Sequence, residues 1–326
     1  MVCGCFSRQL RLCVAMAGTV CAFTLARADE GGVSFWLPGQ FGSLAAVPGE
    51  PGWSMPLVYY HSSVDAGGNK TLRVGGNITS GLNGDANLLF AGPTYTFETP
   101  LLGGQAATML LAAYGHMTTS AEAKLTGPRG RVFEVNPSDS VSGGSDLYSM
   151  NTLKWSDGVD NTLAYAMVGA PVGAYRKGRL ANIGTNHWSI DAGGGYTYFD
   201  KQRGHEASAV VGLTYNFKNL DTDYQNGVDA HLDWGASQFL NRQFHLGLVG
   251  YFYRQLAADS GSGAVLGAFK SRVSAVGPQA GYFFQAANRQ WYVNLKGYYE
   301  IDAANRAKGW NAWLAFLIPL EPQRNR

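Results

Sequence analysis

Apolar and polar residues alternate with a period of two along several stretches of the chain after residue 53. The clearest are 188–199, 206–217, 228–236 and 291–301, where every second residue is aromatic, aliphatic or Ala and the residues between are mainly polar or Gly. A β-strand sends successive side chains to opposite faces of its sheet. Each stretch therefore predicts a strand with one apolar and one polar face.

The same pattern along the whole chain predicts about twelve strands, separated by Gly, Asn and Asp clusters. They span 54–64, 85–98, 106–124, 145–156, 160–173, 186–201, 204–218, 227–240, 243–258, 270–286, 290–304 and 308–319. The first five alternate less regularly. Connections after odd-numbered strands are long and those after even-numbered strands are short, except the short last one.

This alternation of loop length is typical of transmembrane barrels, which have short periplasmic turns and longer external loops. Within hydrocarbon, an unpaired backbone N–H or C=O is so costly that strands can span a bilayer only as a closed sheet. We therefore predict an all-β fold, a transmembrane antiparallel β-barrel of about twelve strands. A soluble β-sandwich is the alternative fold, although nothing in a sandwich would gather the long loops at one end.

Composition and charge exclude other classes. Charged residues make up 15% of the chain and aromatic residues 13%, a balance opposite to that of disordered proteins. A formal net charge of +2 provides no basic surplus, so we expect no nucleic-acid partner.

Residues 1–28 have the pattern of a cleavable signal peptide. Arg8 and Arg11 precede an uncharged run from Leu12 to Leu25, and Ala26 and Ala28 flank the expected cleavage site. A retained membrane anchor is the alternative, but the run is shorter than the roughly 20 residues that a spanning helix needs. All four cysteines lie in this region, so the mature chain would have no thiol for a disulfide or metal site. We expect export to the bacterial outer membrane, with its lipid bilayer as the partner.

Residues 29–53 are rich in Gly and Pro, and Pro38, Pro48 and Pro51 prevent a continuous helix or central strand. The segment nevertheless carries side chains too apolar to prefer water, namely Phe35, Trp36, Leu37, Phe41 and Leu44. We predict that this segment folds into the lumen as a plug, and that residues 54–326 form the barrel.

Two stretches resemble a known family. They are FWLPGQFGSLAAVPGEPGW, from Phe35 to Trp53, and the ending from Gly309-Trp310-Asn311 to Ile318-Pro319-Leu320. Both are similar to the bacterial outer-membrane family labelled as involved in the meta-pathway of phenol degradation. The resemblance implies a β-barrel transporter for small hydrophobic or aromatic solutes. The chain departs from many barrels in ending at Glu321–Arg326 without a terminal aromatic residue.

The polar faces of the later strands provide the candidate lumen residues. They are Asp191, Glu206, Asp229, His231, Asp233, Asn294, Lys296 and Glu300. Asp229, His231 and Asp233 follow one another on one face at about 6.6 to 7 Å, which would suit a cation or a polar solute. The alternative is a hydrated lining whose charges pair across strands. A metal site is not expected, because one strand rarely brings three ligands to one ion.

Catalytic and cofactor motifs are missing from the sequence. The six histidines are scattered, and neither a G-x-S-x-G nor a phosphate-binding loop occurs. We predict no enzyme activity, no catalytic residues and no cofactor, and instead a monomeric channel that admits small hydrophobic or aromatic solutes by passive diffusion. Two alternatives keep the barrel: a structural or adhesive protein acting through loops 65–84 and 125–144, and a barrel hydrolase.

Overall fold

The computed structural model describes residues 34–66, 71–74, 77–126, 132–135, 137–264 and 270–320. The predicted signal peptide, residues 1–28, lies outside the described residues. The strands are β1 (Gly52–Asp65), β2 (Thr71–Val74), β3 (Asn77–Ala91), β4 (Thr94–Thr96), β5 (Gln105–Thr126), β6 (Val132–Val135), β7 (Ser138–Gly144), β8 (Leu147–Asp157), β9 (Asp160–Ala170), β10 (Ser189–Asp200), β11 (His205–Asn216), β12 (Asp229–Phe239), β13 (Phe244–Gln255), β14 (Arg272–Ala286), β15 (Arg289–Ala304) and β16 (Lys308–Pro319).

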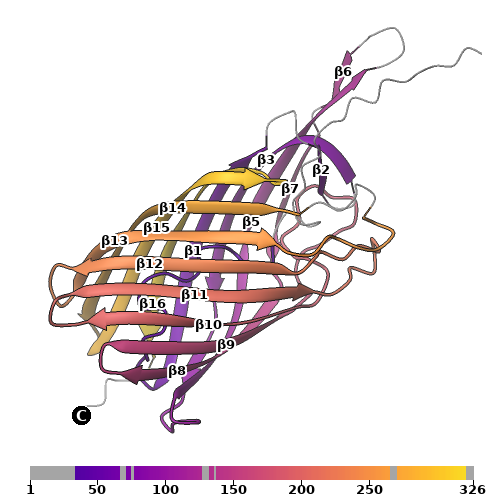
Figure 1. Cartoon of the computed structure of the whole chain (residues 1–326). Helices are drawn as coiled ribbons and strands as arrows, with labels where there is room; N and C mark the ends of the chain where they lie inside the picture. Colours follow the sequence, from indigo (N-terminus) through magenta and orange to yellow (C-terminus); the bar gives the residue numbers. More distant parts are fainter. Residues whose placement is uncertain are drawn as a thin grey trace, which may run out of the picture.

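The strands form one antiparallel sheet that closes on itself (Figure 1). The first and last strands, β1 and β16, pair from Ser54 opposite Pro319 to Asp65 opposite Lys308. Neither therefore presents a free edge, and the backbone groups that hydrocarbon would leave unpaired are bonded between strands. The predicted closed barrel is confirmed.

The wall of this barrel is twelve strands around. Each of the twelve positions, here called a stave, is filled by one strand or by two strands that follow each other in line. Strands β3 and β4 both lie between β1 and β5 and form one stave, interrupted at Pro93, which has no N–H to donate. Likewise, β7 and β8 both pair with β5 and form one stave. The short strand β2 pairs with the start of β3, and the short strand β6 pairs with the end of β5. The predicted loops 65–84 and 125–144 thus contain strands, because β2, β6, β7 and the start of β3 continue the backbone pairing at the long-loop end.

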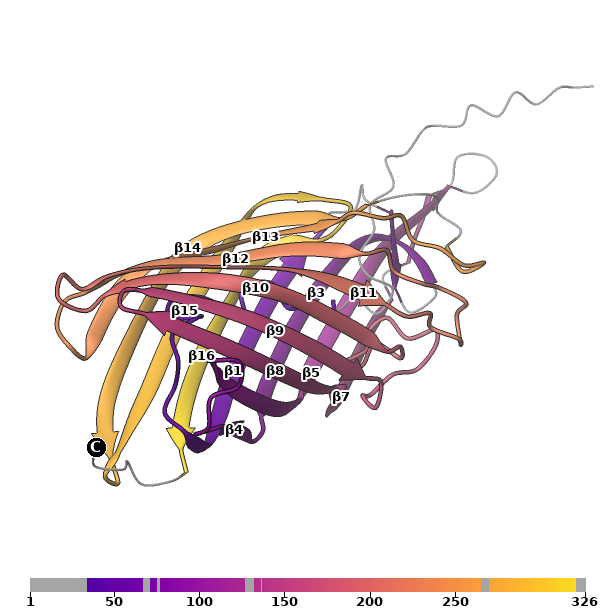
Figure 2. The ribbon, with the colours of Figure 1, turned by 60° about the horizontal axis from the view of Figure 1, so that its bottom comes forward.

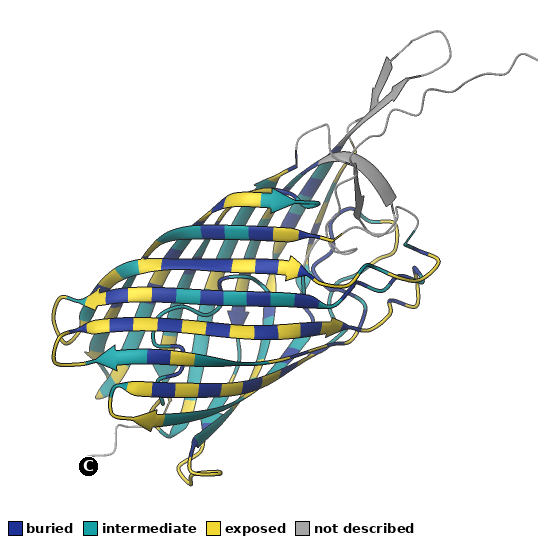
Figure 3. Ribbon diagram, in the orientation of Figure 1, coloured by how far each residue is buried: buried dark blue, intermediate teal, exposed yellow. Residues whose placement is uncertain are grey.

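Burial alternates along β9 to β12, as Figure 3 shows. In β11, for example, Val211 and Leu213 are more than half exposed on the outer face, while Glu206 and Ser208 are buried on the inner face. In β10 to β12 the outer face is mainly apolar and the inner face mainly polar, as predicted. No helix in the described part of the chain is long and apolar enough to cross a membrane.

The inner face of the other half of the wall is apolar. Strands β3, β5, β8 and β9 point buried apolar side chains inward, namely Leu88, Phe90, Met117, Met150, Leu163 and Met167. The polar inner face that was predicted for the later strands therefore does not extend to this half. Because both faces of these strands are apolar, the period-two pattern is weak there, which explains the poor regularity of the first predicted strands.

Long connections gather at one end of the barrel and short turns at the other, and the chain leaves β16 at the short-turn end (Figure 2). The connection 171–188 turns inward at the long-loop end, where Leu180, Ala181 and Ile183 are buried. The carboxylate of Asp146 holds it in place: it accepts hydrogen bonds from the amides of Gly173 (2.9 Å) and Thr185 (2.8 Å) and from the Thr185 hydroxyl (2.7 Å).

Candidate functional site

Residues 34–51, here called the N-terminal segment, lie inside the barrel. Phe35 and Trp36 are buried in the same apolar cluster as inward side chains of β8 and β9. Phe35 packs against Tyr148, which lies at the long-loop end of the wall, with ring centroids 5.8 Å apart. At the other end, the amide of Gly49 donates to the side chain of Gln105 at 2.7 Å, next to the short turns. The segment therefore follows the lumen from one end to the other.

A carboxylate from β12 and an ammonium group from β15 bind the backbone of this segment. Asp233 of β12 accepts hydrogen bonds from the amides of Gly39 (2.9 Å) and Phe41 (3.1 Å). Lys296 of β15 donates to the carbonyls of Gly39 (2.6 Å), Gln40 (3.1 Å) and Phe41 (3.3 Å). Hydrogen bonds to charged groups are about twice as strong as those between neutral groups. Asp233 thus accepts hydrogen bonds from the backbone N–H groups of Gly39 and Phe41, and Lys296 donates hydrogen bonds to the carbonyl groups of residues 39–41, in a part of the chain that has no strand or helix partner.

Glu206 continues this row of contacts toward the short-turn end. It accepts a hydrogen bond from the amide of Leu44 at 2.8 Å, and Thr197 accepts one from the amide of Ala46 at 3.0 Å. Leu44 adopts a φ of 65°, which is uncommon for a residue with a side chain and is stabilised here by the Glu206 contact. The hydroxyls of Ser43 and Ser237 lie 2.9 Å apart.

Asp191, His231 and Tyr165 form a buried polar group beneath Trp36. Nε2 of His231 lies 3.0 Å from Asp191, and the hydroxyl of Tyr165 donates to the same carboxylate at 2.6 Å. The imidazole of His231 stacks on the indole of Trp36, with centroids 3.5 Å apart and planes 15° apart. The wall thus offers Trp36 a flat, hydrogen-bonded ring as a platform.

The remaining predicted lumen residues also point inward, but their hydrogen bonds go to the wall. Asp229 accepts from Asn216 at 3.0 Å, and the amide of Asn294 donates to the carbonyl of Ala280 at 3.2 Å. Glu300 accepts from the hydroxyl of Tyr251 at 2.8 Å and from the amide of Gly309 at 2.7 Å. That these residues contact a solute stays a prediction.

A cavity of about 290 Å³ remains between the N-terminal segment and the apolar half of the wall. The segment contributes Leu37 and Phe41 together with the polar residues Gln40 and Ser43, and the wall contributes mainly apolar side chains. The large apolar side chains of the wall that line the cavity include Phe90, Met109, Leu111, Met150 and Trp313. Asn294 and Lys296 are its polar border on the β15 side. The arrangement offers an apolar space with a few polar groups at one edge, which is the usual composition of a small-molecule site.

Sequence reasoning missed several of these residues. Tyr165, Met109 and Met150 belong to strands that were predicted, but apolar residues on both faces hid which ones point inward. Gln105 and Lys154 bind the segment near the short turns, Lys154 through the carbonyl of Val47 at 3.0 Å. Only the inward parity of a correctly placed strand could have indicated Lys154.

The described residues contain no group of three or more His, Cys, Asp or Glu side chains that could hold a metal ion. Ser237 and His245 form a Ser–His contact of 3.1 Å, but the other ring nitrogen of His245 lies 2.9 Å from the hydroxyl of Tyr292. A nucleophile–base pair of the serine-hydrolase type has a carboxylate in that third position. The geometry here is that of a hydrogen-bonded lumen lining.

The fold is similar to those of solved outer-membrane barrels. An outer membrane channel from Pseudomonas putida F1 superposes with a TM-score of 0.65 at 16% identity, over 87% of this chain and 99% of that chain. A FadL homologue from Pseudomonas aeruginosa gives 0.42 at 7% identity, over 82% and 90%. The transport unit of the autotransporter AIDA-I from Escherichia coli gives 0.46 at 11% identity, over 83% and 91%. No curated protein matches the chain.

The sequence profile of one family matches residues 61–316. The matched region comprises nearly the whole barrel and follows the segment 35–53 that carries part of the resemblance. Because this region is more than half of the chain, the protein belongs to the family described as "Putative MetA-pathway of phenol degradation", as the resemblance predicted.

Proposed function

We propose that the protein is a monomeric channel of the bacterial outer membrane that passes small apolar or aromatic solutes along their concentration gradient. Residues 54–326 would form the pore wall. Residues 29–53 would act as a plug that narrows the lumen to a path lined by apolar side chains. The family description, which refers to phenol degradation, supports an aromatic solute.

The single observation that carries this proposal is the cavity beside the N-terminal segment. Its volume of about 290 Å³ is close to the lower end of the range for small-molecule pockets, roughly 300 Å³. Met109, Met150 and Trp313 provide polarisable surface that favours an aromatic ring. A hydrated ion would find few polar partners in this space, so the lining selects against it.

The predicted lumen residues divide into two roles in this proposal. Asp233, Glu206 and Lys296 keep the segment against the polar half of the wall, and Asp191 orients His231 under Trp36. Asn294 borders the cavity and would contact a polar substituent of the solute, such as a hydroxyl group. The segment thus uses its backbone for attachment and leaves apolar side chains facing the solute path.

A cavity-filling variant tests the proposal. Met150→Trp would place an indole in the space, whereas Val168→Trp places one on the outer face of the adjacent strand β9, where Val168 is exposed. Uptake of radiolabelled phenol and toluene is compared at low concentration in cells that express each variant. We expect Met150→Trp to reduce uptake at least threefold and Val168→Trp to leave it unchanged. Equal uptake by both variants and by cells that lack the protein would overturn the proposal.

A further inference from the structure

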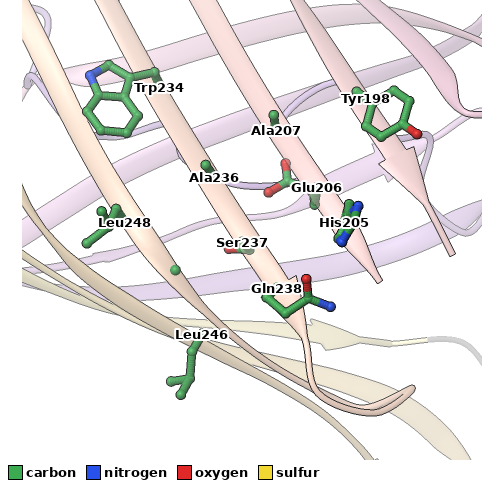
Figure 4. Close-up of a pocket in the computed structure, with 11 residues that line it drawn as sticks. Tyr198, His205, Glu206, Ala207, Trp234, Ala236, Ser237, Gln238, Leu246 and Leu248 are labelled. Atoms are coloured by element: carbon green, nitrogen blue, oxygen red, sulfur yellow. The ribbon is translucent and has the colours of Figure 1, made fainter. Parts of the chain in front are cut away.

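The outer wall of the barrel has a groove that is separate from the lumen. It opens on the bilayer-facing side of β10 to β13, close to the short turns, and has a volume of about 460 Å³ (Figure 4). The outward-facing part of its floor consists of Ala207 and Ala236, which are cross-strand partners, and the buried neighbours Glu206 and Ser237 also border it. In the same row, Tyr198 pairs with Ala207 and Leu248 pairs with Ala236. Two small side chains therefore lie between two large ones, which leaves a trough about two strands wide.

Trp234 closes the end of the groove nearer the middle of the membrane. Its indole lies flat over Gly250, where a Cβ atom would come within 2.5 Å of the ring. Glycine at this position allows the ring to lie along the wall rather than project into lipid. The groove therefore has a floor, two sides and an upper end, and it opens toward the short turns.

Basic residues lie in the two turns next to the open end. Lys201 and Arg203 lie in the turn between β10 and β11, and Arg242 lies in the turn between β12 and β13. All three are exposed. Asp200 lies 3.8 Å from Arg203, so one acidic group accompanies three basic ones. In barrels of this type, short turns face the periplasm, where the membrane leaflet consists of phospholipid.

We propose that this groove binds one anionic phospholipid of the periplasmic leaflet, of the phosphatidylglycerol type. One acyl chain lies on Ala207 and Ala236 between Tyr198 and Leu248, and the phosphate is bound by Arg203 and Arg242. The acyl chain meets the apolar trough, and the phosphate meets the basic residues in the turns, which lie at the level of the headgroups. The site is independent of the proposed solute path, because the barrel wall separates the two.

Native mass spectrometry of the purified, folded protein tests this site. The protein in detergent is incubated with equal amounts of phosphatidylglycerol and phosphatidylethanolamine, and retained lipid is counted per chain. We expect the wild type to retain one phosphatidylglycerol. Ala207→Leu combined with Ala236→Leu fills the trough and should reduce retention at least tenfold. The matched control, Ala164→Leu with Ala166→Leu on the outer face of β9, should retain lipid as the wild type does.

Headgroup recognition is tested separately with Arg203→Gln combined with Arg242→Gln. We expect this variant to bind both lipids equally, with loss of at least a fivefold preference for phosphatidylglycerol. Equal retention by the trough-filling and control variants would overturn the proposal, as would a wild type that shows no lipid preference. A wild type that appears as a dimer which the trough-filling variant dissociates would assign the groove to a second copy instead, and would also overturn it.

Discussion

At the scale of single residues, the N-terminal segment is bound through its backbone, and Gly39 has both a backbone conformation and a close contact that oppose any side chain. Gly39 has a φ of 89° and lies against the ring of Tyr298, whose nearest atom would be 2.8 Å from a Cβ. A side chain there would meet both backbone strain, about 1–2 kcal/mol, and a steric clash. The contacts of its amide with Asp233 and of its carbonyl with Lys296 depend on this close approach.

Gly39→Ala should therefore release the middle of the segment from the wall. We expect a severalfold higher mean single-channel conductance in planar bilayers, because the lumen becomes wider. Gly49→Ala is the matched control, since a Cβ at Gly49 meets no atom within 4 Å. If both variants conduct as the wild type does, Gly39 does not hold the segment in the lumen.

The predicted lumen residues illustrate what sequence can show at this scale. Period-two alternation placed Asp233, Glu206 and Lys296 on the inner face correctly, because parity along a strand is a local property. It could not show that their partners are amides and carbonyls more than 150 positions away in the chain, as for Leu44 and Glu206. Backbone atoms carry no sequence signal, so a backbone-bound segment leaves no pattern of complementary charges.

At the scale of elements, the carboxylate of Asp146 makes three of the hydrogen bonds that hold the inward-folded connection 171–188. Asp146 is buried and accepts three hydrogen bonds from Gly173 and Thr185. Each hydrogen bond to a charged group contributes about 1.5–3 kcal/mol to stability. The loss of all three therefore strongly favours the open form of the connection. Asp139 adds a second attachment, because it accepts a hydrogen bond from the amide of Leu180 at 3.2 Å and lies 3.6 Å from Arg179.

Asp146→Ala should free the connection while leaving the wall intact. Arg176 and Lys177 are exposed in it and are trypsin sites. We expect cleavage there to become at least tenfold faster in the variant, because the loop opens more often. Asp157→Ala, at a short turn on the other end, should be cleaved at the wild-type rate. Slow cleavage of Asp146→Ala would show that apolar packing of Ile183 and its neighbours is sufficient.

The carboxylate of Asp223 links two further connections, 217–228 and 256–271. Lys218 lies 2.8 Å from Asp223, and the amide of Ser262 donates to the same carboxylate at 2.8 Å. The hydrogen bond from Lys218, followed by those from Ser262, holds the pKa of Asp223 well below its usual value. A pKa lower in the folded state than in the unfolded state means that the contact stabilises the loops above about pH 4 and is lost as pH falls through the folded-state pKa.

Hydrogen exchange of the peptide 258–264 measures this linkage. We expect its protection to be constant from pH 7 to about pH 4 in the wild type, after correction for intrinsic exchange, because the carboxylate stays charged. Asp223→Asn should lower the protection across this range, and Asp157→Asn should not. Wild-type protection that already falls near pH 5 would contradict the direction of the shift.

Strand boundaries could be predicted within a few residues for β1, β5 and β8 to β16, whereas the predicted strand 85–98 matches β3 and β4 poorly. The face that points inward was harder to predict where the inner face is apolar. The inner side chains of β3 and β8 are apolar, so Phe90 and Met150 look like outward residues in the sequence. The extra length of β3, which begins at Asn77 rather than 85, also escaped detection because its pairing with β2 lies beyond the wall.

At the scale of the whole molecule, pairing between β1 and β16 joins the first and last strands of the sheet, and a sheet closed in this way resists unfolding by detergent. Backbone pairing is continuous from Ser54 to Asp65, so no edge is available for unfolding to begin. The protein should migrate faster in an unheated than in a boiled gel sample. A single mobility under both conditions would be inconsistent with a closed sheet.

If the N-terminal segment runs through the lumen of this barrel, a disulfide should form between Ser43→Cys and Ser237→Cys, whose wild-type hydroxyls lie 2.9 Å apart. The pair is made in a chain in which Cys3, Cys5, Cys13 and Cys21 are each replaced by Ser. We expect spontaneous crosslinking in the outer membrane, with neither thiol labelled by maleimide. Ser43→Cys with Ser149→Cys, on a different strand, should not crosslink. Two free, labelled thiols in the Ser43–Ser237 pair would contradict the account.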